Sequence, residues 1–366
     1  MLVLDKNEKK KQITIEDIYD FLEEWGGEPF YTDFGLISAT ICHNESGGSK
    51  KLYYYEENQM FYCYTNCGSF DIFDLVIKVY EKQQNKVLDL NDAIRLIAAR
   101  AGIAGRIDDV VSEDKLIDWD ILSNYDRIQK IQTNIGEKVQ LKEYDNDILD
   151  RFNYSLKISP WLEEDITQEV IDFARIGYYP GGDQITIPHY DENDRFIGLR
   201  GRTLCEADAE LYGKYRPLRV NNMTYNHPLG MNLYGLNWAK STIKPIKKAI
   251  VLESEKSVLK YMSYFGIENN IAVACCGSSF TFQHFIALLN TGAEEIIIAF
   301  DKQYEALNTE ESKKWKEKLM KIYRKYKNEC LISFMWDKED LLGYKSSPID
   351  EGKDKFLYLF KERIIL

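Results

Sequence analysis

The second half of the chain alternates short apolar runs with segments that have helical spacing. The runs are KAIVLE, IAVACCG, EIIIAFD and LISFMWD, at residues 248–253, 271–277, 295–301 and 331–337. Strands that alternate with helices predict parallel βαβ units, because a parallel partner strand is reached only through a crossover connection. The ligand crevice of such a sheet lies outside the carboxyl ends of its strands. The alternation therefore predicts an α/β sheet with a site at that edge.

Acidic residues end three of these runs. We expect Glu253, Asp301 and Asp337 to gather along the carboxyl edge of the sheet. Carboxylates at neighbouring strand ends suit Mg²⁺, which takes one or two of them together with waters and phosphate oxygens. The pattern alone equally allows Glu253 and Asp301 to be ordinary acids at helix N-termini, where the helix dipole favours them. Lys256, one helical turn on, is either a phosphate contact or a solvated surface lysine.

Three cysteines and a histidine cluster in the first 70 residues. They form two close pairs, Cys42 with His43 and Cys63 with Cys67, and an aromatic stretch separates the pairs. A structural zinc site takes four sulfur or nitrogen ligands, usually as two pairs from two loops. Adjacent residues of a strand point to opposite faces, so Cys42 and His43 must lie on a turn to share one ion. The alternative is that all four are buried small residues of an apolar sheet.

The N-terminal third has its own succession of helices and strands. Residues 14–24 have amphipathic spacing, with Thr14 as the N-cap, and predict a short helix. Aromatic and β-branched runs in residues 30–68 predict a small antiparallel sheet, and two stretches with helical spacing follow it. Residues 104–148 are rich in Asp, Lys, Gln and Asn, and we interpret them as a charged connector.

Composition and charge limit the class of protein. The 366 residues are 45 % hydrophobic and 29 % charged, which excludes a mostly disordered chain. The net charge of −12 argues mildly against nonspecific nucleic-acid binding. No run reaches the roughly 18 apolar residues of a membrane helix, and charges occupy the N-terminus where a secretory signal has its apolar core. We therefore expect a cytoplasmic protein with reduced cysteines.

The sign of the charge reverses locally between Arg195 and Lys248. Ten lysines and arginines in this stretch outnumber three acids, and tyrosines are interleaved with them. Basic side chains on a strand contact phosphates, and aromatic rings offer stacking surfaces for unpaired bases. This stretch is therefore a candidate nucleic-acid interface, with a solvated basic surface as the alternative.

Taken together, these motifs resemble those of bacterial DnaG-type DNA primases, most of all the compact phage-encoded ones. The family's CHC2-type zinc-binding domain resembles residues 14–103, with MFYCYTNCG before FDIFDLVIKVY. The primase core resembles FARIGYYP, ITIPHYDENDRFIGLRGRTL, GKYRPLR and NLYGL, and its TOPRIM part resembles IVLESEKSVL, CCGSSFTFQH and IIIAFDKQ. The order and spacing of these motifs make the resemblance specific.

The resemblance implies a multidomain fold that combines α+β and α/β architecture. A zinc-ribbon-like antiparallel sheet with helices comes first, and a primase core with a parallel-sheet TOPRIM subdomain follows. The expected parts are a zinc-binding domain, a connector, a basic part of the polymerase core, and the TOPRIM subdomain with the C-terminal segment, at residues 1–103, 104–148, 149–248 and 249–366.

The resemblance also implies roles for single residues in the two metal sites. The family's zinc ligands match Cys42, His43, Cys63 and Cys67, although its commoner spacings are Cys-x₂-His and Cys-x₂-Cys. The TOPRIM glutamate matches Glu253, a magnesium ligand in this interpretation, and the first acid of the Asp-x-Asp pair matches Asp301.

Several acids of the family's pattern are replaced in this chain. Gln303 stands where the second acid of the first pair is expected. Asp350 matches the second acid of a later pair, whereas Ser346 and Ser347 occupy the region of its first acid. The number of bound metal ions is therefore open. Asp337 and Glu305 are the two acids that could compensate, and the sequence does not decide between them.

The basic residues that match family positions face template, primer or incoming nucleotide. Arg202 and Lys214 are expected to take part in catalysis as well as binding, together with the acids Glu253 and Asp301. The residues expected to bind nucleic acid or nucleotide are Arg200, Arg202, Lys214, Tyr215 and Lys256.

The implied activity is synthesis of short RNA primers on single-stranded DNA from ribonucleoside triphosphates, with structural zinc and catalytic Mg²⁺ or Mn²⁺. The alternatives are a catalytically silent single-strand binding module and a TOPRIM nuclease or topoisomerase-like enzyme. The chain ends at Leu366, soon after the TOPRIM region, so we expect no helicase-binding domain. A replicative helicase is a candidate partner by another route, and a membrane is not.

Overall fold

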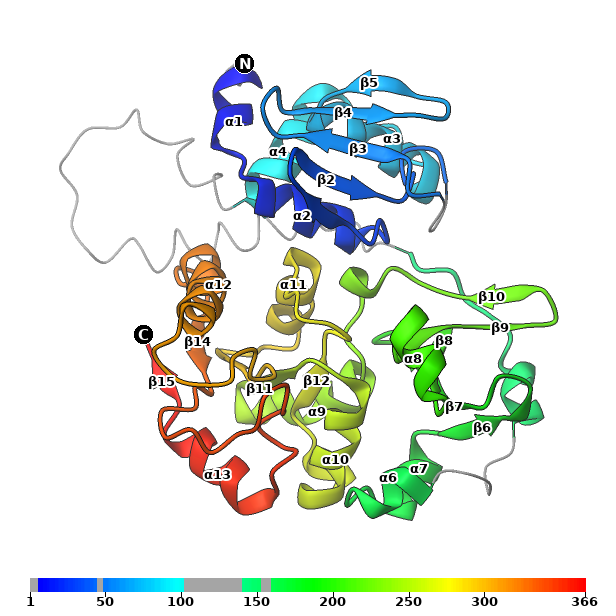
Figure 1. Ribbon diagram of the computed structural model, residues 1–366, viewed down its shortest axis with the longest axis vertical. Helices are drawn as coiled ribbons and strands as arrows, with labels where there is room; N and C mark the ends of the chain where they lie inside the picture. The colour runs from blue at the N-terminus through cyan, green and yellow to red at the C-terminus, as the bar shows by residue number, and fades with distance from the viewer. Residues whose placement is uncertain (1–5, 45–48, 102–139, 153–158) are drawn as a thin grey trace. The chain divides into compact units, whose positions relative to one another are not determined.

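The computed structural model describes residues 6–44, 49–101, 140–152 and 159–366. They fall into two compact units, Met1–Gln140 and Leu141–Leu366, here called unit 1 and unit 2 (Figure 1). Most of the predicted connector, residues 104–148, lies outside the described residues. No helix in the described part of the chain has both the length and the apolar character needed to cross a bilayer.

Unit 1 combines helices with one five-stranded antiparallel sheet, in the order β1-β2-β3-β4-β5. The predicted helix and antiparallel sheet of this region are confirmed. The elements are α1 (Lys6–Gln12), α2 (Ile15–Glu24), β1 (Phe30–Thr32), β2 (Gly35–Ser38), β3 (Leu52–Tyr55), β4 (Met60–Cys63), β5 (Gly68–Phe70), α3 (Ile72–Gln84) and α4 (Leu90–Arg100).

Local chemistry explains where α2 begins and which face of the sheet is buried. The Thr14 hydroxyl accepts from the Asp17 N–H (3.2 Å), and Asp17 Oδ2 accepts from the Thr14 N–H (2.9 Å), which caps the first turn. Side chains alternate along the strands, so Tyr54 and Phe61 are buried in the core, whereas Tyr62 lies on the exposed face. Each buried aromatic side chain contributes about 1.5 to 3 kcal/mol.

Unit 2 begins with a second antiparallel sheet, in the order β10-β9-β8-β7-β6. Its long central pair, β7 and β8, is joined by a turn in which Asp191 accepts from the backbone N–H groups of Asn193 (2.9 Å) and Arg195 (3.0 Å). The elements are η2 (Asn146–Arg151), α6 (Ser159–Glu163), α7 (Gln168–Phe173), β6 (Gly177–Tyr179), η3 (Pro180–Gly182), β7 (Gln184–Tyr190), β8 (Phe196–Thr203), α8 (Glu206–Tyr212), β9 (Tyr215–Val220) and β10 (Met223–Tyr225).

The rest of unit 2 is built on a third sheet, in the order β12-β11-β13-β14-β15. The first four strands are parallel, as the alternating pattern predicts, and β15 is antiparallel to β14. The elements are η4 (Leu229–Met231), α9 (Leu236–Ile246), β11 (Lys248–Leu252), α10 (Glu255–Phe265), η5 (Ile267–Asn269), β12 (Ala272–Ala274), α11 (Phe282–Asn290), β13 (Glu295–Ile298), α12 (Glu310–Tyr326), β14 (Leu331–Phe334), α13 (Lys353–Lys361) and β15 (Ile364–Ile365).

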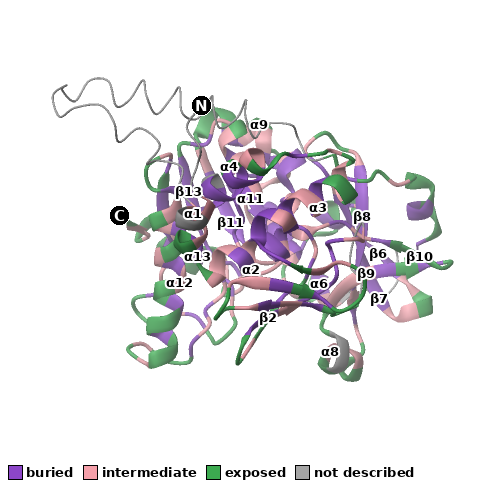
Figure 2. Cartoon of the chain, turned by 90° about the horizontal axis from the view of Figure 1, so that it is seen from above, coloured by how far each residue is buried: buried purple, intermediate pink, exposed green. Residues whose placement is uncertain are grey.

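The order of the parallel strands defines a switch point. The chain leaves β11 for β12 on one side and then crosses back to β13 on the other side of β11. Crossovers of this kind are right-handed, so α10 and α11 cover opposite faces of the sheet (Figure 1). The strands between them are almost wholly buried (Figure 2). The carboxyl ends of β11 and β13 therefore open at the place where such sheets bind ligands.

Candidate functional site

Four side chains converge in unit 1 around the His43 imidazole. His43 Nδ1 lies 3.3 Å from Cys42 Sγ, 3.6 Å from Cys63 Sγ and 3.4 Å from Cys67 Sγ. All four ligand atoms lie within 4.8 Å of one another. In a tetrahedral zinc site, a nitrogen ligand and a sulfur ligand are about 3.6 Å apart, given the usual bond lengths. The cluster therefore has the spacing of one tetrahedral metal centre.

Local backbone structure brings these ligands together. Cys42 and His43 lie on a turn after β2, as the shared ion requires. Cys63 ends β4, and Cys67 precedes β5 in the turn that joins the two strands. Thr65, in the same turn, lies 3.3 Å from His43 Nε2, which leaves Nδ1 to face the sulfurs.

The thiols of this cluster differ in acidity. Burial acts to raise the pKa of Cys63, but hydrogen bonds from the Thr65 hydroxyl and from the backbone of residues 65–67 outweigh it and lower the pKa to about 6. Burial and the neighbouring thiols raise the pKa of Cys42, and burial raises that of Cys67. A cation among the three sulfurs favours their thiolate forms. These residues can hold a metal ion.

Three carboxylates lie at the carboxyl edge of the parallel sheet in unit 2. Glu253 follows β11, Asp301 follows β13, and Asp350 lies in the loop before α13. One oxygen of each is buried without a hydrogen-bond partner, namely Glu253 Oε1, Asp301 Oδ1 and Asp350 Oδ1. A buried carboxylate oxygen without a partner is costly, and a cation is the partner that three of them at one edge favour.

The negative charges of neighbouring carboxylates raise the pKa values of Glu253 and Asp301. Burial, and then the charge of Asp301, raises the pKa of Glu253 to about 8. Burial, and then the charge of Asp350, raises the pKa of Asp301 to about 7. Divalent cations replace protons in such surroundings. The ligand oxygens of the three acids are not all within 4.8 Å of one another, so an ion here would keep water or phosphate ligands, as Mg²⁺ usually does.

Two lysines lie close enough to the acids to oppose this effect. Lys256 on α10 acts to lower the pKa of Asp301, and it forms an ion pair with Glu164. Lys318 on α12 acts to lower the pKa of Glu253. Both pKa values nevertheless stay raised. Lys256 is thus near the acids, and its ion pair holds it there.

Asp337 follows β14, but its carboxylate is already satisfied. It accepts from the backbone N–H groups of Leu341 (2.9 Å) and Leu342 (2.8 Å) and lies 3.6 Å from Lys302 Nζ. Asp350, rather than Asp337, is the acid that raises the pKa of Asp301. The prediction that Glu253, Asp301 and Asp337 form one site is therefore corrected. Asp350 takes the place of Asp337, because the Asp337 carboxylate is already bound by Lys302 and by two loop N–H groups.

Two of the positions at which this chain departs from the family's acidic pattern, Ser346 and Ser347, form hydrogen bonds with acids further along the chain. The Ser346 hydroxyl donates to Glu351 Oε1 (3.1 Å), and the Ser347 N–H donates to Asp350 Oδ2 (3.0 Å). Gln303 is half-buried, and the side chain of Glu305 is exposed. The Ser347 backbone thus helps to orient the one acid of this loop that faces Asp301.

Four of the predicted binding residues lie together where β8 meets β9. Arg202 pairs in register with Tyr215, and its charge acts to lower the pKa of the Tyr215 hydroxyl against the effect of burial. The Arg200 guanidinium lies over the Tyr215 ring, 5.7 Å from its centroid. Lys214 is exposed beside them, and its carbonyl accepts from the Thr203 N–H (3.0 Å).

Sequence analysis missed a buried polar cluster that joins β7 and β8 to α10. Glu255 Oε1 accepts from Arg200 Nη1 (2.8 Å) and lies 3.2 Å from His189 Nε2. Burial acts to raise the pKa of Glu255, but Arg200 and the hydrogen bond with His189 together outweigh it and lower the pKa to about 2. Cys276 Sγ also lies within 4.8 Å of the ligand atoms of His189 and Glu255. The one signal in the sequence is His189 in an otherwise uncharged strand.

Comparison with known proteins gives one relative along nearly the whole chain. No model of a known family matches. The SPbeta prophage-derived uncharacterized protein YorJ of Bacillus subtilis (strain 168) is 38 % identical over 376 residues, which covers 98 % of this chain and 97 % of YorJ. The chain belongs to the YorJ family. The relative's prophage origin agrees with the compact phage-encoded proteins that the motifs resemble.

Several solved structures are also similar, at low identity. The Aquifex aeolicus primase (zinc-binding and RNA polymerase domains) is 18 % identical with a TM-score of 0.46, covering 100 % of this chain and 87 % of that one. A DnaG primase catalytic domain bound to ssDNA is 20 % identical with a TM-score of 0.44, covering 67 % and 81 %. The RNA polymerase domain of Mycobacterium tuberculosis primase DnaG is 15 % identical with a TM-score of 0.42, covering 67 % and 82 %.

Proposed function

We propose that the protein is a DNA primase, a nucleotidyltransferase that makes short RNA primers on single-stranded DNA. The observation that carries the proposal is the group of Glu253, Asp301 and Asp350 at the switch point of the parallel sheet, each with a buried, unpartnered oxygen. Acids at this place favour a divalent cation and the phosphates of a nucleotide. The resemblance of the sequence motifs to those of DnaG-type primases indicates which reaction such a site would catalyse, namely primer synthesis.

In the proposed reaction, the 3′-hydroxyl of one ribonucleotide attacks the α-phosphorus of the next, and the bond to pyrophosphate breaks. Mg²⁺ or Mn²⁺, when bound, neutralises the charge that develops on the phosphates. Glu253, Asp301 and Asp350 would hold it from three separate segments of unit 2. The raised pKa values of the first two acids mean that binding displaces protons.

The basic residues supply the remaining contacts in this proposal. Arg202 and Lys214 bind phosphates of the nucleotide and of the strands, and Tyr215 lies opposite Arg202 on the neighbouring strand. Arg200 is buried and fixed by its ion pair with Glu255, and its guanidinium packs over the Tyr215 ring beside them. Lys256, in the first turn of α10, is a candidate contact for the triphosphate.

We assign zinc to the cluster in unit 1. Three sulfurs and one imidazole nitrogen at tetrahedral spacing are the donor set that Zn²⁺ prefers. The site is closed, because all four positions are taken by protein ligands, which is typical of a structural zinc.

The exposed face of the unit 1 sheet supports contact with unpaired bases. Rings of Phe34, Tyr53, Tyr55, Tyr62 and Tyr64 pack in pairs on this face, with centroids 4.5 to 5.9 Å apart for Phe34–Tyr53, Phe34–Tyr55, Tyr53–Tyr64 and Tyr62–Tyr64. Single-strand binding proteins use such rings as stacking platforms. The proposed partners are a single-stranded DNA template, ribonucleoside triphosphates and, by an undetermined route, a replicative helicase in the bacterial cytoplasm.

The test is incorporation of labelled ribonucleotides on single-stranded DNA with Mg²⁺ or Mn²⁺. We expect Asp301→Asn and Glu253→Gln each to lower incorporation by about 100-fold or more, because the metal contributes several kcal/mol to the transition state. The melting temperature should hold or rise, since removing one charge relieves repulsion at this edge. Asp354→Asn, an exposed acid on α13, is the matched control and should keep full activity.

Three results would contradict the proposal. Full incorporation by the Asp301→Asn variant would move the metal site elsewhere. DNA binding without incorporation at saturating Mg²⁺ or Mn²⁺ would favour the silent binding module. Nicked DNA in place of new RNA would favour a nuclease or topoisomerase-like enzyme.

A further inference from the structure

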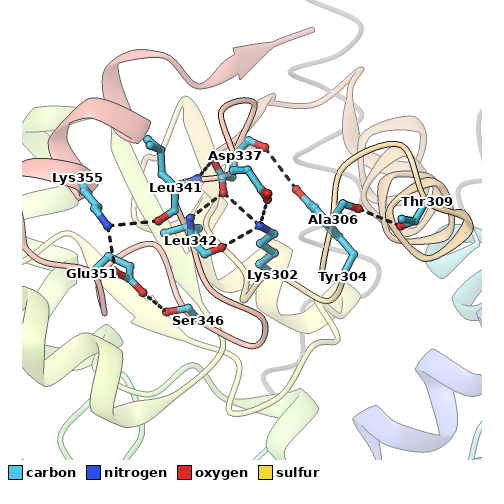
Figure 3. A network of polar contacts seen from close by, with 11 residues as sticks. Lys302, Tyr304, Ala306, Thr309, Asp337, Leu341, Leu342, Ser346, Glu351 and Lys355 are labelled. Carbon is cyan, nitrogen blue, oxygen red and sulfur yellow. Dashed lines mark hydrogen bonds and ion pairs between the residues drawn. The ribbon is translucent and has the colours of Figure 1, made fainter.

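The residue after Asp301 points into the protein and carries a buried charge. The side chain of Lys302 is 3 % exposed. Its ammonium group forms ion pairs with Asp337 and Asp340 and donates to the Leu342 carbonyl oxygen (2.8 Å), as Figure 3 shows. A buried lysine is costly unless it is fully paired, and here all three of its donors have partners.

The backbone of Lys302 is bound to the same segment. Its N–H donates to the Ser346 carbonyl (3.0 Å), and its own carbonyl accepts from the Lys345 N–H (2.7 Å). Side chain and main chain therefore tie position 302 to residues 337–346 at both ends of that segment. Asp337 closes the segment on itself by accepting from two of its amides, those of Leu341 and Leu342.

This segment leads directly to Asp350. The Ser347 N–H, one residue beyond the Ser346 carbonyl that Lys302 binds, donates to Asp350 Oδ2 (3.0 Å). The Asp350 N–H in turn donates to the Ser347 carbonyl (2.9 Å). A chain of hydrogen bonds thus runs from the residue beside Asp301 to the carboxylate that faces it.

We propose that Lys302 is a positioning residue that fixes the Asp350 loop against the strand end carrying Asp301, and so sets the spacing of the two acids. The proposal rests on the function proposed above. Movement of the loop away from Lys302 separates the buried ammonium from Asp337, Asp340 and the Leu342 carbonyl, and it leaves the buried Asp337 carboxylate without its cation. That penalty selects one loop position, which an apolar residue at 302 would not do.

The test measures Mn²⁺ binding by the full-length protein, from the electron paramagnetic resonance signal of free Mn²⁺. Lys302→Met alone leaves the buried Asp337 carboxylate without a neighbouring cation, which destabilises the fold, so the decisive variant is Lys302→Met with Asp337→Asn. The amide oxygen that Asp337→Asn introduces can still accept from the N–H groups of Leu341 and Leu342. We expect this double variant to keep its melting temperature within a few degrees and to bind Mn²⁺ about 10-fold more weakly. If the Asp350 loop occupies the metal-binding position in only about one tenth of the molecules, the apparent affinity for Mn²⁺ falls about 10-fold.

A kinetic readout separates positioning from a general loss of structure. We expect the Mg²⁺ concentration for half-maximal primer synthesis to rise about 10-fold in the double variant, whereas kcat at saturating Mg²⁺ recovers to within about twofold. Lys345→Met is the matched control, because its side chain is exposed on the same segment, and it should leave both quantities unchanged.

Comparison with Asp301→Asn distinguishes the two proposals. If Asp301→Asn weakens Mn²⁺ binding but the double variant binds as the wild type does, the role of Lys302 is wrong and the metal site stands. If Asp301→Asn itself leaves Mn²⁺ binding unchanged, the metal site is wrong, and the role of Lys302 falls with it. A folded double variant with lowered kcat but unchanged Mg²⁺ dependence also overturns the positioning role.

Discussion

Asp301 and Asp337 each follow a strand of the same parallel sheet, yet their surroundings give them opposite properties. Asp301 has a buried oxygen without a partner and a pKa raised by burial and Asp350 to about 7. Asp337 has two backbone donors and the Lys302 ammonium group. Position in the βαβ pattern predicts where an acid lies, but it does not describe the loops that supply or withhold the acid's partners. The sequence therefore located both acids without separating the one that is free to bind a cation from the one that is not.

The Cys and His cluster could be predicted more fully, because its chemistry is local. One ligand pair follows β2 and the other lies at the end of β4 and in the turn after it, and β2 and β4 both pair with β3. Spacing and strand pattern together therefore define the site. The buried group of Glu255, Arg200 and His189 could not, since its members lie 11 to 66 positions apart and no motif links them.

Replacing Cys63 by Ser should remove the metal from unit 1. We expect elemental analysis to find about one zinc per chain in the wild type and none in Cys63→Ser, with unit 1 unfolding at a lower temperature. A structural zinc contributes about 10 kcal/mol or more to a small domain, which exceeds what a core of this size supplies alone. Cys205→Ser, an exposed cysteine of unit 2, is the control and should keep its zinc. A wild-type protein without zinc contradicts the assignment.

At the scale of elements, periodicity predicted strands and helices well and their ends poorly. The run EIIIAFD was expected to end as a strand at Asp301, but β13 ends at Ile298. The run IAVACCG becomes only the three residues of β12, because Cys276 adopts a left-handed backbone conformation (φ +60°) and turns the chain away from the sheet. Strand ends depend on which neighbours remain to pair, which periodicity does not contain.

The start of β13 offers a test of how the sheet is stabilised. Burial acts to raise the pKa of Glu295, but hydrogen bonds from Arg363, Lys248 and Ser333 outweigh it and lower the pKa to about 2. A carboxylate with a lowered pKa stabilises the fold above its unfolded pKa, about 4.5, and that contribution is lost as the pH falls towards 2. We expect Glu295→Gln to lower the free energy of unfolding by about 2 kcal/mol at pH 7.

The same variant should lose its effect in acid. Denaturant unfolding at pH 7, 5 and 3 should show the difference from the wild type shrinking between pH 5 and pH 3. In this range the Glu295 carboxyl of the unfolded chain takes up a proton, whereas that of the folded chain, with its pKa of about 2, stays ionised. Glu294→Gln is the matched control, since Glu294 is exposed and its ion pair with Lys247 (3.5 Å) lies on the surface. That pair contributes about 0 to 1 kcal/mol. A pH-independent effect of Glu295→Gln would mean that the side chain acts through packing and not through charge.

At the scale of the whole molecule, each unit has its own core and its own candidate metal site. Buried side chains such as Phe21, Trp25 and Phe73 fill unit 1, and Ile250, Val251 and Ile297 fill the parallel sheet of unit 2. The predicted fold class, an antiparallel sheet with helices followed by a parallel sheet, is confirmed by the strand pairing. The fold class could be predicted because each unit has its own pattern along the sequence. Apolar residues alternate with a period of two in the strands of unit 1, and strands alternate with helices in unit 2.

This independence predicts how a fragment of residues 141–366 behaves. It contains the acids, the basic residues of β8 and β9 and a complete parallel sheet, so it should fold alone and extend a supplied primer at a rate close to that of the full chain. It lacks the exposed aromatic face of unit 1, and a tethered second site raises the local concentration of template. Primer initiation should therefore fall by about 10-fold or more, and adding residues 1–140 as a separate chain at equal micromolar concentration should not restore it. Initiation and extension rates on the same templates decide the matter. If the fragment initiates at the same template positions and rates as the intact protein, unit 1 has only a structural role.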